Sequence, residues 1–258
     1  MSSPQSLSLL YVGFLFIGRH ISYGRNMYTT IYFLIGCVNL ALLIYAVQAW
    51  RRTRSLTVLL ITLPMAFLWY DNYVIAAGTT LGEGPLLKGL SFVRFASHYL
   101  LLPFWFIVIA RLMRTAGYRV GQTRWLQIAA VATTIGFAGW EMYEFLHLEL
   151  LPVCLGDTLR YSTFVGEGQE CYPGMAGTGG YVPLAGSFAL IGLLLLLGGA
   201  LWRTHNWPWL FGGTLVMFVF AGIPSSVAGP FLSNMAEPVI NGAILATALR
   251  LEQPQQTV

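Results

Sequence analysis

The chain has 258 residues, of which 56% are hydrophobic and only 9% are charged, and its mean hydropathy is +0.66. Soluble globular proteins carry about 25% charged residues, so this composition excludes an ordinary water-soluble domain and predicts a multi-pass membrane protein. The formal net charge is +4. The basic residues flank apolar stretches and do not alternate with aromatic residues on one face, so no nucleic-acid partner is expected.

Seven apolar runs are each close to the ~20 residues that a helix needs to cross the hydrocarbon core. They predict an all-α transmembrane bundle that forms a single domain over residues 1–258. The expected spans cover residues 28–50, 56–77, 88–112, 124–147, 180–202, 207–228 and 230–250. A shorter apolar run at residues 7–18 is either a helix at the membrane surface or an eighth span.

The basic residues fall at alternate ends of these runs, at Arg51, Arg52, Arg54, Arg111, Arg114, Arg119, Arg124, Arg203 and Arg250. The positive-inside rule then predicts a cytoplasmic C-terminus, with a disordered tail at 251–258. It also puts the long loop at 148–179 outside. Cys154 and Cys171 lie in that loop and could pair in an oxidising compartment, although two cysteines alone leave the bridge open.

Ionisable side chains recur at similar depth in four of the expected spans. Asp71, Arg94, His98, Glu141 and Glu237 lie about six to ten residues from the predicted outer ends. A charged side chain near the bilayer centre costs about 2.5–3.5 kcal/mol on insertion scales. We therefore expect these groups to face one another in an aromatic-lined cavity open to the outer side.

The spacing suggests roles for the residues of this cavity. The candidate catalytic residues are Asp71, His98, Glu141 and Glu144. The candidate ligand-binding residues are Arg94, Trp69, Tyr73, Trp140, Glu237 and Asn241. A carboxyl kept protonated by apolar surroundings, from Glu141 or Asp71, would act as general acid while His98 relays the proton. Arg94 would bind an anionic headgroup, and the aromatic residues would form the wall.

The same residues also have purely structural interpretations. Asp71 or Glu141 could form a structural salt bridge with Arg94. Glu144 and His147 could simply reach headgroup water at a helix end, and the aromatic residues could belong to an interface belt.

Three functions remain open. The first is an enzyme acting on a lipid or isoprenoid-like molecule by acid–base chemistry. The second is a binding or transport protein, in which the same acids and Arg94 recognise a polar solute or form a proton path. The expected partner is a membrane lipid or an apolar small molecule. The third is a structural subunit of a membrane complex. The cofactor is left unknown, and no residue is assigned as a metal ligand. The only lysine, Lys88, is misplaced for a retinal Schiff base, and the histidines do not form a three-histidine zinc pattern, which leaves a mixed histidine and carboxylate site as the metal-binding alternative.

Overall fold

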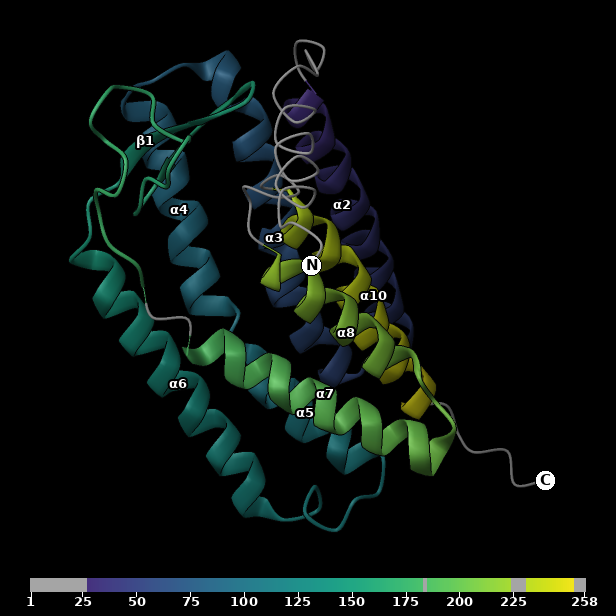
Figure 1. Cartoon of the computed structure of the whole chain (residues 1–258). Coiled ribbons are helices and arrows are strands. Elements are labelled where there is room, and N and C mark those ends of the chain that lie inside the picture. Colours follow the sequence, from purple (N-terminus) through teal and green to yellow (C-terminus); the bar gives the residue numbers. More distant parts are fainter. Residues whose placement is uncertain (1–26, 183–184, 224–230, 253–258) are drawn as a thin grey trace, which may run out of the picture.

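Figure 1 shows the computed structural model, which describes residues 27–182, 185–223 and 231–252. The described chain is mostly helical. Its helices are α2 (Met27–Thr53), α3 (Leu56–Leu81), α4 (Pro85–Leu101), α5 (Phe104–Thr115), α6 (Arg124–Leu146), α7 (Ala185–His205), α8 (Trp209–Gly222) and α10 (Leu232–Glu252). A short turn joins α4 to α5, with Pro103 immediately before α5. The apolar run at 7–18 lies outside the described residues.

The helices form two neighbouring groups, one around α2, α3 and α10 and the other around α4, α5 and α6. Helix α2 lies along α3, and α10 packs against both of them and against α8. Helix α7 packs on α8 and α5, whereas α6 lies against α4 and α5 on the other side of the molecule (Figure 1). The largest hydrophobic core surrounds α5, where Trp105, Ile109 and Leu112 are buried against residues of α3, α7 and α10. This core therefore connects the two groups of helices.

Four helices in the described chain are long and apolar enough to cross a membrane: Met27–Thr53, Leu56–Leu81, the combined Pro85–Thr115, and Ala185–His205. They confirm the expected spans at 28–50, 56–77, 88–112 and 180–202. The expectation of seven spans is wrong for the described residues, since the other three runs form helices that do not meet both requirements. In α6, Gln127 and Glu141 lower the hydropathy, and α8 has only 14 residues. In α10 polar residues, including Glu237 and Asn241, lower the hydropathy.

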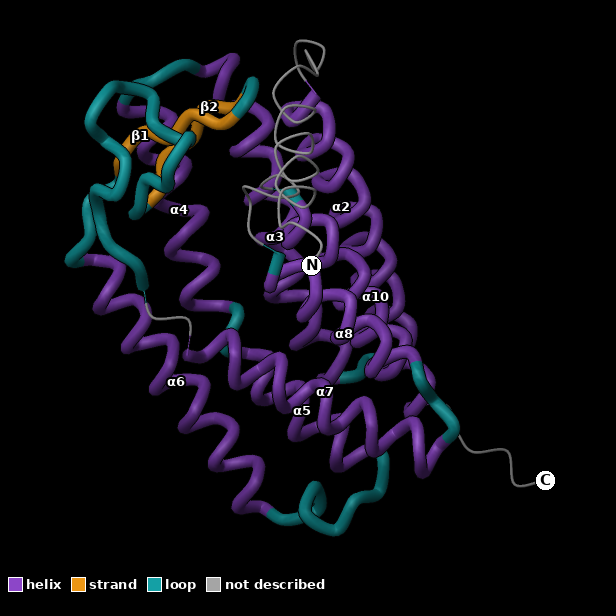
Figure 2. Tube along the Cα trace, in the orientation of Figure 1, coloured by secondary structure: helices purple, strands orange, loops and turns teal. Residues whose placement is uncertain are grey.

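The expected loop at 148–179 contains a two-stranded antiparallel sheet, which sequence reasoning did not foresee (Figure 2). Strand β1 (Leu151–Leu155) pairs with β2 (Thr158–Ser162), and Leu155 is directly opposite Thr158. Only Gly156 and Asp157 connect them, and Gly156 has φ +58°. Two-residue hairpin turns favour glycine at such a position because it carries no Cβ. Any Cβ there would also collide with the Tyr28 ring.

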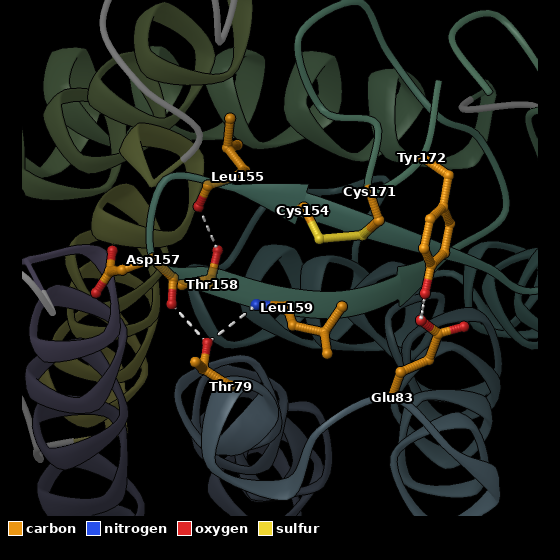
Figure 3. Close-up of a disulfide and its surroundings, with 9 residues drawn as sticks. All are labelled: Thr79, Glu83, Cys154, Leu155, Asp157, Thr158, Leu159, Cys171 and Tyr172. Carbon is orange, nitrogen blue, oxygen red and sulfur yellow. Dashed lines mark hydrogen bonds between the residues drawn. A yellow bond between two sulfur atoms is a disulfide. The ribbon is translucent and has the colours of Figure 1, made fainter. Parts of the chain in front are cut away.

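The turn of this hairpin is attached to the ends of two helices (Figure 3). The Asp157 carboxylate accepts the backbone N–H groups of Tyr28 at 2.9 Å and Thr29 at 3.2 Å, and so caps the first turn of α2. The Thr79 hydroxyl donates to the Asp157 carbonyl at 2.5 Å and accepts from the Leu159 N–H at 3.2 Å. One turn thus satisfies orphan N–H groups of α2 and also binds α3.

A disulfide and a tyrosine hold the remainder of the loop. Cys154 and Cys171 form a disulfide, the outcome that the sequence left open. The Tyr172 hydroxyl donates to the Glu83 carboxylate (Figure 3). This hydrogen bond raises the pKa of the Tyr172 phenol, because the neutral phenol is the form that donates.

The C-terminal prediction needs one correction. Leu251 and Glu252 were expected in a disordered tail, but they are the last residues of α10. The Ser55 hydroxyl donates to the Glu252 carboxylate, so the end of α10 is tied to the start of α3. Residues 253–258 lie outside the described chain.

Candidate functional site

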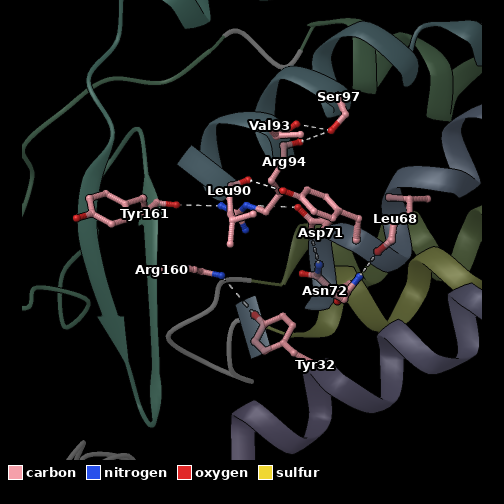
Figure 4. A network of polar contacts seen from close by, with 12 residues as sticks. Tyr32, Leu68, Asp71, Asn72, Leu90, Val93, Arg94, Ser97, Arg160 and Tyr161 are labelled. Carbon is pink, nitrogen blue, oxygen red and sulfur yellow. Dashed lines mark hydrogen bonds and ion pairs between the residues drawn. The ribbon is translucent and has the colours of Figure 1, made fainter. Parts of the chain in front are cut away.

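Arg94 lies at the centre of a polar network between α3, α4 and β2 (Figure 4). Its side chain is 6% exposed, and its Nε lies 3.5 Å from Oδ1 of Asp71. One terminal nitrogen donates to the Tyr161 backbone carbonyl at 3.0 Å, and the guanidinium lies 4.4 Å from the centre of the Phe95 ring. The expected pairing of Arg94 with Asp71 is present. Arg94 also connects the hairpin to the helices.

The same turn of α3 makes two polar contacts with α10. Asn234 donates to Oδ2 of Asp71 at 3.3 Å, and Asn72 donates to Oε2 of Glu237 at 3.3 Å. Asn72 is fully buried and also donates to the Leu68 carbonyl at 2.8 Å. In the described chain Glu237 has no ion-pair partner within 4.0 Å. Its carboxyl therefore contacts an amide and no cation in the described chain.

A cavity of about 120 Å³ lies beside Glu237, where α3, α4, α5, α7, α8 and α10 meet. It is lined mainly by apolar side chains, with His98, Ser187, Glu237 and Asn241 as the polar residues. Asn241 is 2% exposed, and its Nδ2 has no hydrogen-bond partner in the described chain. The apolar lining consists of Leu68, Leu102, Trp105, Leu190, Ile191, Leu194, Met217, Ile240 and Ile244.

A much smaller space of about 10 Å³ lies on the other side of His98, next to Asp71, Arg94 and Ser97. Its volume is about that of one water-sized probe. His98, Leu68 and Leu102 line both spaces. His98 is thus the polar side chain that the two spaces share. The four-residue spacing of Arg94 and His98 brings them to one face of α4, as the sequence predicted.

The site lies farther from the end of α3 than the sequence indicated. Helix α3 continues to Leu81, four residues beyond the predicted end of its span. Asp71 is consequently ten residues from that end, or about 15 Å at 1.5 Å per residue, and not the ~9 Å expected from an end at residue 77. Leu68, which lines both spaces, lies near the middle of α3.

The three candidate residues of α6, Trp140, Glu141 and Glu144, do not line this cavity. Glu141 is 4% exposed, and its carboxylate accepts the backbone N–H of Gly186 in the first turn of α7. Glu141 therefore has a structural partner at the N-terminus of α7 and not the Arg94 partner considered above. Glu144 accepts from the indole N–H of Trp140 at 3.2 Å on an exposed part of α6.

Trp69 and Tyr73 also lie away from the cavity, although they share α3 with Asp71. The Tyr73 hydroxyl and the Cys37 thiol are 3.1 Å apart, and the Tyr73 ring packs against Phe33 of α2 and against Trp69. Residues two apart on a helix are rotated by about 200°. Asp71 therefore faces α4 and α10, whereas Trp69 and Tyr73 face α2.

Sequence reasoning missed three partners of the network. Asn72 and Asn234 carry no charge, so the survey of ionisable residues passed over them. Position was the available signal: Asn72 directly follows Asp71, and Asn234 lies three residues before Glu237. The Tyr161 carbonyl gave no signal, because it belongs to a strand that was not predicted.

Four helices in the described chain are long and apolar enough to cross a membrane, as is typical of a multi-pass membrane protein, and a polar network lies inside the helical core. No family model matches the chain, nor does any curated protein or solved structure. The described residues also contain no group of three or more His, Cys, Asp or Glu side chains arranged to hold a metal ion.

Proposed function

We propose that this protein binds a small, mostly apolar part of a membrane-soluble molecule, such as the end of a lipid or isoprenoid, in the cavity beside Glu237. The observation that carries the proposal is the composition of the cavity wall, which combines nine apolar residues with a few convergent polar groups. Ligand sites for small molecules typically have this composition, with the polar groups fixing orientation.

The volume limits what can enter. A space of about 120 Å³ is close to the ~150 Å³ of an engineered apolar cavity that accommodates benzene. An entire lipid is far larger. The proposal is therefore that one end group enters the cavity, while the rest of the molecule lies between helices or in the bilayer.

The polar groups define how that end group would be held. Among the described residues the buried Nδ2 of Asn241 has no hydrogen-bond acceptor, and leaving such a donor unpaired costs about 1–3 kcal/mol. A ligand carrying a carbonyl, hydroxyl or ether oxygen would satisfy it. We therefore infer an end group that is apolar apart from one hydrogen-bond acceptor.

Acid–base catalysis is the second candidate function. The observation that favours it is the presence of two titratable side chains, His98 on α4 and Glu237 on α10, in the same cavity. Glu237 would give a proton to the bound acceptor, and His98 would take one from it. Among the earlier catalytic candidates only His98 lines this cavity. Glu237, first assigned to binding, would become the acid.

The test combines mass spectrometry of co-purifying molecules with two variants. Asn241→Leu keeps the volume and removes the donor, so it should lower ligand occupancy about tenfold or more. Glu237→Gln should retain the ligand and abolish turnover if acid–base chemistry occurs. Thr134→Val serves as a control, because Thr134 is a buried hydroxyl on α6 away from the cavity. Equal occupancy in Asn241→Leu and in the control would refute the binding proposal.

A further inference from the structure

A second, larger recess lies where the basic C-terminal parts of α2, α5 and α10 meet the N-terminal end of α3. It has a volume of about 730 Å³ and is separate from the cavity beside Glu237. Its wall contains the last two turns of α2, the first residue of α3, Arg111 of α5 and the end of α10. The lining residues are Tyr45, Gln48, Ala49, Arg52, Thr53, Ser55, Leu56, Arg111, Leu249 and Glu252.

Two guanidinium groups give this recess a positive lining. The Nε of Arg111 donates to the hydroxyl of Thr57, which is fully buried, at 3.1 Å. This bond orients the guanidinium, while no described residue accepts a hydrogen bond from its two terminal nitrogens. Neither Arg111 nor Arg52 forms an ion pair within the described chain. Both therefore retain donors for an anion from outside.

One carboxylate also lines the recess and reduces its charge. The Glu252 carboxylate accepts a hydrogen bond from the Ser55 hydroxyl. This bond attaches Glu252 to the N-terminal end of α3, which begins at Leu56. The Ser55 side chain in turn accepts the N–H of Val58 as the N-cap of α3. Two arginines and one glutamate leave the recess with a formal charge of +1, and the N-terminus of α3 adds a favourable partial charge for an anion.

We propose that this recess binds a phosphate group, and that its source is the headgroup of an anionic membrane lipid. Arginine is suited to phosphate because its planar fork donates two parallel hydrogen bonds. Ala49, Leu56 and Leu249 add an apolar wall beside the two arginines, which suits the first carbons of acyl chains better than free phosphate. Basic pockets between membrane-spanning helices bind lipid headgroups in this way.

The recess is also at the right depth for such a headgroup. Arg51 and Arg52 occupy the last turn of α2, and Arg250 occupies the last turn of α10. Clusters of arginine at the ends of apolar helices lie at the level of lipid headgroups. The volume is about six times that of the cavity beside Glu237 and accommodates a glycerophosphate group.

The purified full-length protein in neutral detergent provides the test. Binding of short-chain phosphatidylglycerol is measured by native mass spectrometry and by the shift in thermal unfolding, with phosphatidylcholine and inorganic phosphate as separate probes. Arg111→Gln should weaken phosphatidylglycerol binding about tenfold or more, since a charge-assisted hydrogen bond is lost. Arg52→Gln should act in the same direction. Arg51→Gln is the matched control, because Arg51 adjoins Arg52 but does not line the recess.

The outcomes separate the possible explanations. The proposal holds if phosphatidylglycerol binds more tightly than phosphatidylcholine and the loss is confined to Arg52→Gln and Arg111→Gln. Binding of inorganic phosphate as strong as that of the lipid, with the same variant pattern, assigns the site to free phosphate and overturns the lipid source. An equal loss in Arg51→Gln, or no loss in Arg111→Gln, overturns the site itself.

Discussion

Replacing Arg94 by methionine should be among the most destabilising single changes in the polar network. The substitution removes the cation beside Asp71, whose side chain is only 16% exposed, and leaves the Tyr161 carbonyl without its donor. Removing one partner of a buried ion pair costs about 3–5 kcal/mol. The lower end of that range applies, because Asn234 still donates to the Asp71 carboxylate. We expect the free energy of unfolding to fall by about 3 kcal/mol.

A second substitution separates the two parts of that loss. In the double variant Arg94→Met/Asp71→Leu no unpaired carboxylate remains. The buried Tyr161 carbonyl is orphaned, at about 1–3 kcal/mol, and the Asn234 amide, which is only half-buried, also loses its acceptor. The double variant should therefore be more stable than Arg94→Met alone. Because Arg94 connects β2 to the helices, backbone amides of the hairpin should also exchange hydrogen faster in both variants.

Equilibrium unfolding in detergent micelles measures these differences, with hydrogen exchange as the local readout. Arg114→Met is the control, since Arg114 is exposed in the last turn of α5 and should change stability by less than about 0.5 kcal/mol. A loss below about 1 kcal/mol in Arg94→Met would refute the reasoning. A double variant as unstable as the single one would show that the unpaired carboxylate is not the source of the loss.

Three further outcomes concern the hairpin and its loop. Reduction of the Cys154–Cys171 disulfide, which closes a separation of 17 residues, should destabilise the loop by about 3 kcal/mol, measured by comparing unfolding with and without reductant. Asp157→Ala removes the cap of α2 and should cost about 1 kcal/mol, whereas Asp157→Asn should cost less; equal losses would contradict the capping role. The raised pKa of Tyr172 means that its bond to Glu83 stabilises the loop at neutral pH and is lost as the pH rises above the ordinary value of 10.0. Tyrosine NMR titration should show a lower pKa in Glu83→Gln.

The common level of the polar residues could be predicted from the sequence, although their distance from the helix end was underestimated for α3, and their direction around each helix could only partly be predicted. Depth follows from counting along an apolar run, and Asp71, Arg94, His98 and Glu237 do meet at one level. The direction of a side chain around the helix axis can be predicted only when one face of the helix differs in sequence from the others. Helix α3 is buried on several sides, so nothing in its sequence distinguishes the face of Asp71 from that of Tyr73.

The predictions for α6 failed for a related reason. Glu141 could be assigned to a buried position from its surroundings, and it is buried. Its partner is the backbone of Gly186, a group that every residue carries and that no sequence pattern marks. The hairpin was missed likewise, because neither five-residue strand alternates polar and apolar side chains: β1 is apolar throughout and contains a proline, and β2 mixes both kinds irregularly.

The attachment of Asp157 to the first turn of α2 has a consequence for biosynthesis. Tyr28 and Asp157 are separated by 129 positions in the chain. At about 5–20 residues per second, a ribosome needs roughly 6–26 seconds to add that length. During this interval α2 has emerged without the carboxylate that completes its first turn, and Thr79 on α3 likewise lacks its partners. The contacts that complete this end of α2 and α3 can therefore form only after α6 and the hairpin have been synthesised.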